Sequence, residues 1–402
     1  MSKMKIFFRR IHLWLSLAAG TVILICCVTG ALLVFQKELE QAFHHDRYFV
    51  EQAKQKLSAD QLIKIVKEHN AASKINGIRI YTDAERSAEI NVSVPEKGES
   101  KDRNTTSKTS TVKQESRPPS LTVFIDPYTG SILDVYNPRE GFFYQVMSLH
   151  RWLLGGSDSI GKTITGISTL IFLFILITGI ILWWPKTEKI LMRQLKIKRS
   201  AGWKRFNHDL HIVLGFYSAI FLFIFAFTAL AWSFEWFNNG IYAVTNSPLQ
   251  PPSPPKSLYV PGAKAISYDK ALEAAGTVLK DAQYYNISKP RDSVAAMSIT
   301  SLGRNALHES ATDVVYIDQY SGKVIGTMLF NERSPGSQVR STFRPIHVGS
   351  IYGTPSKILA VIVCLFGASF PVTGTIMWIN RLKKKKVKAN GKVFVTSTQE
   401  IL

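Results

Sequence analysis

Four stretches of this sequence contain no Asp, Glu, Lys or Arg, and they constrain the fold more than any other feature. They cover residues 12–35, 163–185, 210–232 and 358–380, and they are 24, 23, 23 and 23 residues long. A helix needs about 20 predominantly apolar residues to cross a bilayer. The sequence therefore predicts four transmembrane helices, which excludes a soluble enzyme and a secreted disulfide-stapled domain.

The formal net charge of +20 would suit a nucleic-acid-binding protein, but its distribution indicates a membrane topology. Residues 1–11, 186–208 and 381–402 together hold 19 basic and 2 acidic residues. The long segments are nearly neutral, with 16 basic and 16 acidic residues in 36–149 and 11 and 9 in 233–345. Because basic loops stay on the cytoplasmic side, we expect both termini inside and the long segments outside. Membrane lipid is then the expected contact of the basic segments, and no nucleic-acid partner is expected.

The chain repeats itself. The motif Ile-Asp-x-Tyr-[Thr/Ser]-Gly occurs at residues 125–130 and 317–322, where it predicts a strand, a turn and a second strand. Each copy follows a helix-like stretch with a plausible N-cap, Ser58 or Ser267. Markers in or just before the spans repeat 195 to 199 residues apart: His12 and His211, Thr29 and Thr228, His150 and His347, Thr178-Gly179 and Thr373-Gly374. The sequence predicts two parallel copies of one unit, each a span, an outer α/β domain and a second span.

This repeat predicts a helical membrane bundle of four transmembrane helices with two extracytoplasmic α+β domains. In chain order we expect a transmembrane helix (12–35), an outer domain (36–149), an interfacial segment with the second helix (150–185), a cytoplasmic loop (186–208), the third helix (209–232), a second outer domain (233–345), an interfacial segment with the fourth helix (346–380) and a basic cytoplasmic tail (381–402). The polar stretch 96–120 predicts a disordered insert. The five prolines of 247–256 predict a stiff linker.

Four of the nine histidines lie at the predicted membrane boundaries in pairs that the repeat matches. The pairs are His12 with His211 on the cytoplasmic side and His150 with His347 outside. Two facing imidazoles in an apolar bundle are what a six-coordinate haem iron needs. Zinc is the competing metal, but it favours closed Cys/His sets, often with a carboxylate, and the spans contain no acid. We therefore interpret the pairs as axial ligands of two haems.

Other residues near these pairs leave alternatives open. His208 lies three residues before His211 and is an alternative inner ligand or a hydrogen-bond partner. Arg151 and Arg344 are candidates for pairing with haem propionates, or equally with lipid headgroups. His69 and His308 are interpreted as surface residues. His44 and His45 lie just beyond the first span and are interpreted as surface residues too, with contact to a ligand as the alternative.

Several of these segments resemble a known family. They are Phe8-Arg-Arg-Ile-His-Leu-Trp-Leu, Leu149-His-Arg-Trp-Leu-Leu-Gly, Asn207-His-Asp-Leu-His-Ile-Val-Leu-Gly and Thr-Gly near the span ends. Together they resemble the PepSY-associated transmembrane family, which includes iron-regulated inner-membrane proteins and haem-containing siderophore-iron reductases. The outer Ile-Asp-x-Tyr units look like PepSY domains. One departure is Thr228-Ala229, where the other spans have Thr-Gly.

The resemblance implies a ferric-siderophore reductase of the bacterial inner membrane with two b-type haems per chain, bound by His12, His211, His150 and His347. Siderophores hold Fe(III) far more tightly than Fe(II), so one electron releases the iron. The electron donor would be a cytoplasmic partner protein or a quinone. Two other functions stay open: a membrane-anchored regulatory or protein-binding module without redox activity, and a siderophore permease, which usually carries polar groups at the midplane.

Overall fold

The chain folds into two compact units. The computed structural model describes residues 3–93, 120–200 and 202–399. One unit, the helical unit, comprises Met1–Gln36, Gln145–Ile241 and Thr342–Leu402. The other, the sheet unit, comprises Lys37–Tyr144 and Tyr242–Ser341. The chain thus consists of one unit of long helices and one unit that contains the β-sheet.

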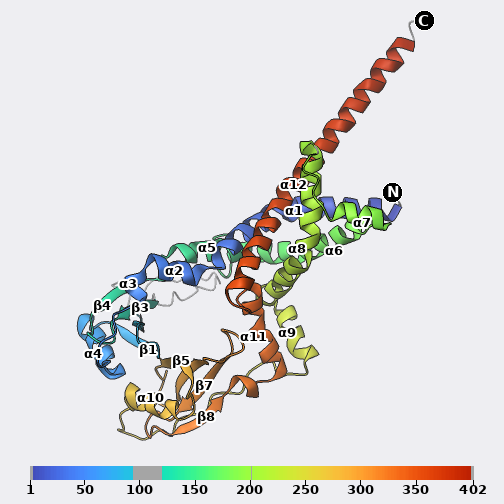
Figure 1. The fold of residues 1–402 in the computed structure, drawn as a ribbon. Helices are drawn as coiled ribbons and strands as arrows, with labels where there is room; N and C mark the ends of the chain where they lie inside the picture. The colour runs from blue at the N-terminus through green and yellow to red at the C-terminus, as the bar shows by residue number, and fades with distance from the viewer. Residues whose placement is uncertain (1–2, 94–119, 201, 400–402) are drawn as a thin grey trace, which may run out of the picture. The chain divides into compact units, whose positions relative to one another are not determined.

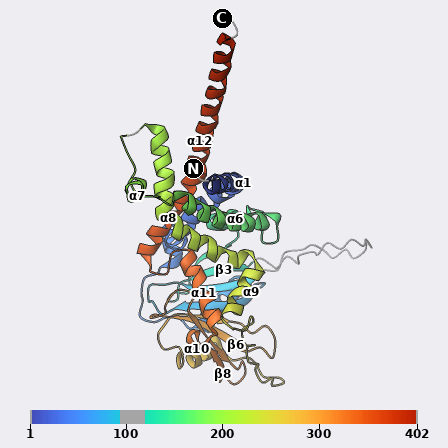
Figure 2. The same ribbon diagram turned by 90° about the vertical axis from the view of Figure 1, so that its right-hand side faces the viewer.

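Four long helices make up most of the helical unit. They are α1 (Lys3–Leu33), α6 (Ile160–Trp183), α8 (Trp203–Ser233) and α12 (Thr354–Gln399). Each packs against two of the others, since α1 and α8 both contact α6 and α12, and the four gather in one bundle (Figures 1 and 2). All four are long and apolar enough to cross a membrane. The structure thus bears out the four predicted transmembrane helices.

The helices extend beyond the charge-free windows that predicted them. α1 begins at Lys3 and α8 at Trp203, whereas the sequence predicted starts at residues 12 and 209. Lys and Arg are good helix formers and their long side chains reach away from an apolar surface, so a helix continues through a basic flank. Of the shorter helices, α7 (Glu188–Gln194) belongs to this unit. Three others run across the boundary between the two units along the chain: α5 (Phe142–Trp152), α9 (Glu235–Val244) and α11 (Pro335–His347).

The sheet unit is built on one antiparallel sheet of eight strands in the order β4-β3-β2-β1-β5-β6-β7-β8. The strands are β1 (Lys74–Tyr81), β2 (Ala88–Ser93), β3 (Ser120–Ile125), β4 (Ile132–Tyr136), β5 (Ala282–Ser288), β6 (Met297–Gly303), β7 (Thr312–Ile317) and β8 (Val324–Met328). Its helices are α2 (Gln36–Phe43), α3 (His45–Tyr48), α4 (Ala59–His69), α10 (Tyr268–Gly276) and the 3-10 turn η1 (Phe330–Glu332). The strand order is that of two four-stranded meanders joined side by side.

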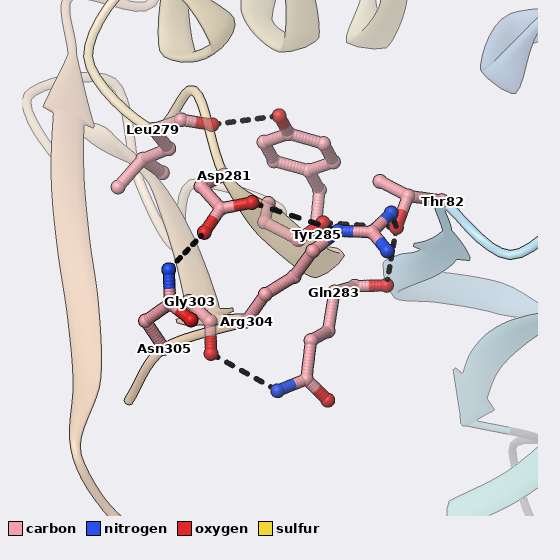
Figure 3. Close-up of polar contacts among 9 residues, drawn as sticks. Thr82, Leu279, Asp281, Gln283, Tyr285, Gly303, Arg304 and Asn305 are labelled. Carbon is pink, nitrogen blue, oxygen red and sulfur yellow. Dashed lines mark hydrogen bonds and ion pairs between the residues drawn. The ribbon is translucent and has the colours of Figure 1, made fainter. Parts of the chain in front are cut away.

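The junction between the two meanders is the pairing of β1 with β5. Ile78 lies opposite Ile287 in this register. Beside the junction the Thr82 hydroxyl donates to the Ala282 carbonyl oxygen at 2.9 Å, and Arg304 donates to Thr82 at 3.2 Å (Figure 3). The sequence predicted two outer domains, and the structure joins the two segments in one continuous sheet.

One face of the sheet is covered by α4 and α10 (Figure 1). The Ser58 side chain forms a capping box at the start of α4, and the Ser267 hydroxyl accepts from Lys270 at the start of α10. Both predicted N-caps are therefore confirmed. A single apolar core lies beneath the two helices, with these fully buried side chains at its centre: Ile78, Ile90, Ile125, Ile287, Ile299, Val315 and Ile317.

The repeated Ile-Asp-x-Tyr-[Thr/Ser]-Gly motif forms the turn that the sequence predicted. Asp126 accepts from the backbone of Tyr128 at 2.7 Å, and Asp318 accepts from that of Tyr320 at 3.0 Å. Gly130 and Gly322 close the two turns with φ angles of +76° and +75°, a region that favours glycine. The predicted insert at 96–120 lies outside the described residues, apart from Ser120, which begins β3.

Candidate functional site

Two histidines from different helices face each other in the helical unit. His150 lies near the end of α5, and His347 is the last residue of α11. Their ring centroids are 6.2 Å apart and the ring planes are inclined by 64°. Both line a cavity of about 380 Å³, which we call the His150 cavity. The structure therefore brings the second predicted pair together.

The other predicted pair also shares a cavity. His12 of α1 and His211 of α8 line a space of about 360 Å³, which we call the His12 cavity. Its walls are mainly apolar and include Phe216 and Phe370. The size of each space is within the range of small-molecule and cofactor sites, roughly 300–1,000 Å³. The bundle thus contains two apolar cavities, each with two histidines in its wall.

Each of the four histidines contacts a threonine of a neighbouring helix through its Nδ1 atom. The Nδ1–Oγ1 distances are 3.0 Å for His12 and Thr178, 2.9 Å for His150 and Thr29, 2.8 Å for His211 and Thr373, and 3.2 Å for His347 and Thr228. In the sequence, these threonines were identified only as positions that recur in the repeat, with no predicted contact to the histidines. The spacing from histidine to threonine is similar in the two copies, 166 and 162 residues for one pair of contacts and 121 and 119 for the other. This similarity was the available sequence signal, but only the helix packing shows that the side chains touch.

The hydrogen bonds of the threonines assign the histidine tautomer. Each hydroxyl donates to a carbonyl oxygen of its own helix, for example Thr29 to Ile25 at 2.6 Å and Thr178 to Phe174 at 2.9 Å. The Thr oxygen is then the acceptor, so the proton sits on Nδ1 of the imidazole. Among the described residues, no hydrogen bond reaches an Nε2 of the four rings. Each ring thus keeps an Nε2 lone pair for a ligand.

Glycines beside three of the threonines make room for the rings. A Cβ built at Gly30 would lie 3.3 Å from Cε1 of His150, and one at Gly179 would lie 3.4 Å from Cε1 of His12. Gly374 stands in the same relation to His211, at 3.4 Å. The fourth threonine is followed by Ala229, and its contact with histidine is the longest of the four. The Thr-Gly pairs therefore let an imidazole approach the helix backbone closely.

Comparison with known families decides the affiliation. Residues 9–381 match the family described as the PepSY-associated TM region. The chain belongs to this family. No curated protein matches the chain. The family match confirms the resemblance drawn from the sequence motifs, and the matched range includes both histidine pairs and all four threonines.

The residues of this family member fit a six-coordinate haem by one geometric test. A metal–imidazole bond is about 2.0–2.1 Å long, so two imidazoles on opposite sides of one metal have ring centres roughly 6 Å apart. The observed 6.2 Å between His150 and His347 agrees with this. Metal-binding histidines also usually donate their second ring N–H to a neighbouring acceptor, and all four rings are placed to do so.

The cavity walls also hold buried polar atoms for which the described part of the chain provides no hydrogen-bond partner. Trp183 Nε1 and Gln194 Oε1 in the His12 cavity, and Thr165 Oγ1 in the His150 cavity, are buried without a hydrogen bond among the described residues. Buried polar atoms are rarely left unsatisfied, so these atoms favour a bound group in each cavity. Among the described residues, no group of three or more His, Cys, Asp or Glu side chains could hold a metal ion. A structural zinc usually takes four protein ligands, so the described side chains do not form such a zinc site.

The structure separates the roles of the two neighbouring histidines in α8. His208 also lines the His12 cavity, but its Nδ1 lies 3.3 Å from Asp209 Oδ1 and its side chain is 47% exposed. Asp209 in turn forms an ion pair with Arg205, with 2.7 Å between Oδ1 and Nε. His211 alone of the two has the threonine contact that the other three histidines make. The geometry therefore favours His211 over His208 as the partner of His12.

Arginines stand in the walls of both cavities. Arg151 and Arg344, the two candidates from the sequence, both line the His150 cavity. Arg151 also stacks on Trp152, with its guanidinium carbon 5.1 Å from the ring centroid. Arg9 and Arg381 line the His12 cavity. The structure therefore brings a guanidinium pair to each cavity, which suits a group with carboxylates.

The remaining histidines lie outside these cavities. His44, His45 and His69 are exposed, as predicted, and His45 stacks on Phe49 with ring centroids 4.7 Å apart. The surface prediction for His308 is wrong, because this side chain is only 8% exposed. It packs edge-on against Phe330 of η1 at 5.3 Å. Sequence spacing could not show that the chain after β8 folds back over this position.

Proposed function

We propose that this protein holds two b-type haems and passes electrons across the bacterial inner membrane to a ferric siderophore. The family match and the four apolar helices support a multi-pass membrane protein. The observation that carries the redox proposal is the pairing of His150 with His347 on one cavity, with both Nδ1 atoms engaged by a neighbouring helix. Two imidazoles per iron leave no open position, which suits electron transfer rather than oxygen binding.

The residues of the two cavities take the following roles in this proposal. His12 and His211 bind one haem, and His150 and His347 bind the other. Each haem, when bound, supplies an iron that changes between the ferric and the ferrous state. The four threonines hold the imidazoles in the tautomer and orientation that present Nε2. Arg151 and Arg344 pair with the carboxylates of the group in the His150 cavity, and the apolar walls exclude water.

The direction of transfer follows from the charge distribution. The excess of basic residues at the termini and in the 186–208 loop supports a cytoplasmic position for these segments. The His12 cavity then opens toward the electron donor, a cytoplasmic protein or a quinone, and the His150 cavity toward the siderophore. Two sites divide a crossing of about 30 Å into shorter electron transfers.

We infer in addition that the chain is a tandem duplication of one unit that carries a PepSY-like domain. Three features support this: the mirrored strand order of the sheet, the two turns closed by Gly130 and Gly322, and the four matching histidine–threonine contacts. Under this inference each haem binds one histidine from each copy.

A reduced-minus-oxidised absorption spectrum of the purified full-length protein, with haem counted per chain, tests the proposal. We expect about two low-spin b-type haems per chain and reduction of an added ferric siderophore by the dithionite-reduced protein. A protein that contains no haem after purification from haem-replete cells would overturn the reductase assignment.

A further inference from the structure

The two cavities share part of one wall. Ile23 of α1 and Phe172 of α6 line both the His12 cavity and the His150 cavity. Both side chains are buried, with 6% and 9% of their surface exposed, and both belong to the apolar core of the helical unit. A thin layer of side chains therefore stands between the two spaces, and Phe172 is its aromatic member.

This wall departs from the symmetry of the repeat. Thr178 and Thr373 are 195 residues apart, and the same offset relates Phe172 to Gly367. A Cβ at Gly367 would lie 2.8 Å from Cys27 Sγ and 3.1 Å from Leu222 Cδ2. The packing at that position therefore leaves no room for a second ring. The four histidines and their threonines match between the two copies. The layer between the cavities does not match, because the first copy has the phenyl ring of Phe172 where the second copy has Gly367.

We propose that Phe172 is the positioning residue through which the electron passes between the two haems. This inference rests on the proposed function. With both haems bound, one electron would leave the iron held by His12 and His211, which would go from ferrous to ferric. It would enter the iron held by His150 and His347, which would go from ferric to ferrous. No bond forms or breaks, no proton moves, and Phe172 is neither oxidised nor reduced.

The physical reason is the filling of space. A packed ring provides continuous atomic contact from one cavity to the other, whereas a void of the same size has no partner atoms. Electron tunnelling is faster through packed matter than across a gap. A single large side chain at this position also keeps the cavities separate, so that each haem has one defined place. Phe172 thus both fills the space between the two cavities and keeps the cavities separate.

The test uses the full-length protein in lipid vesicles with both haems bound. Phe172→Ala and Phe172→Leu are compared with the control Leu173→Ala. Leu173 is the next residue along α6, and its side chain is buried in the same apolar core with 8% exposed. It lines neither cavity. Three quantities are measured: haem per chain, the midpoint potential of each haem, and the rate of electron transfer from the first haem to the second after rapid reduction.

We expect Phe172→Ala to slow the transfer by about tenfold, because the void removes contacts across the wall, and Phe172→Leu to slow it less. Both variants should keep two haems with unchanged midpoint potentials, and Leu173→Ala should transfer at the native rate. A native rate in Phe172→Ala with two haems bound would overturn the proposal. If Phe172→Ala loses a haem, the transfer rate is compared between Phe172→Leu and Phe172→Trp instead. A slower rate in Phe172→Leu than in Phe172→Trp would support the proposal, and the native rate in Phe172→Leu would overturn it. A native protein without haem would instead contradict the proposed function, so the two failures are distinguishable.

Discussion

Asp60 and Asp269 cap each other's helices. The carboxylate of Asp60 accepts from the backbone N–H groups of Tyr268 and Asp269 at the start of α10, both at 3.1 Å. The carboxylate of Asp269 accepts from those of Ala59 and Asp60 at the start of α4, at 2.7 and 3.2 Å. Two helix N-termini that meet would repel each other through their dipoles. The exchanged carboxylates remove this repulsion and join the two halves of the sheet unit.

Replacing either carboxylate should loosen the helix that it caps. Loss of an N-cap side chain typically costs about 0.5–2 kcal/mol, so in the full-length protein Asp60→Ala should raise hydrogen–deuterium exchange in the first turn of α10, and Asp269→Ala in the first turn of α4. The exposed Asp46 provides the control, since Asp46→Ala should leave both turns protected. Exchange that rises mainly in the helix that carries the substitution would contradict reciprocal capping.

The same contact predicts a dependence on pH. Burial acts to raise the pKa of Asp60, but the hydrogen bonds it receives from Asp269 and Tyr268 outweigh burial and hold the pKa below its usual value. A carboxyl with a lowered pKa stabilises the fold above its unfolded pKa, about 3.9, and this contribution is lost as the pH falls through the folded pKa. We expect exchange at the start of α10 to rise below about pH 4. Asp60→Ala, which lacks the titrating group, should show a smaller change over the same range.

Removal of a single histidine should remove a single haem. Because His150 and His347 share one cavity, His150→Ala is expected to retain about one haem per chain, in the His12 cavity, and to lose siderophore reduction. His208→Ala should retain both haems. Full siderophore reduction by His150→Ala, or loss of a haem from His208→Ala with none lost from His211→Ala, would show that the ligands are assigned wrongly.

The threonine contacts should matter through the hydrogen bond alone. Thr29→Val keeps the shape of the side chain but removes the acceptor for His150 Nδ1, and loss of such a partner typically weakens metal binding by about 10- to 100-fold. Thr29→Ser should restore retention of the haem and its midpoint potential. Thr169 lines the same cavity and its hydroxyl donates only to its own helix. Thr169→Val should therefore resemble the native protein in a haem-transfer assay, and equal losses in the two Val variants would argue against the contact.

The glycine beside Thr29 sets how closely His150 can approach. Gly30→Ala should displace the ring by a few tenths of an ångström, as the longer contact beside Ala229 suggests, and the larger Gly30→Val should cost about 1–3 kcal/mol in overpacking and release the haem of the His150 cavity. The matched control is Gly240→Val, where a Cβ meets no atom within 4 Å. Haem counts per chain distinguish these outcomes, and two haems in Gly30→Val would contradict the close approach.

Much of the fold could be predicted from the sequence because its strongest signals are local. The absence of charge predicted each span, and the Asp-Gly turns predicted strand pairs on either side of Gly130 and Gly322. Local patterns do not show which strand pairs with which. The contact of Ile78 with Ile287 joins segments some 200 residues apart, so the single sheet became visible only in the structure.

The candidate site could be predicted in part for the same reason. Repeat spacing paired His12 with His211 and His150 with His347, since equivalent positions of a duplicated bundle face each other. The threonine partners could not be predicted, because their contact with the histidines depends on how each helix is rotated about its axis relative to its neighbour. The spacing of residues along the sequence does not determine this rotation. The choice of His211 over His208 required the same information, because the two lie one helical turn apart.

The pairing of β1 with β5 has a consequence for biosynthesis. Thr82 and its partner Ala282 are 200 residues apart, and a ribosome that adds about 5–20 residues per second needs roughly 10–40 s to make the chain between them. During this time β1 is an open strand edge, which invites association with other chains, while α6 and α8 are still being delivered to the membrane. A nascent chain of this protein therefore has to be shielded at this strand until its second half arrives.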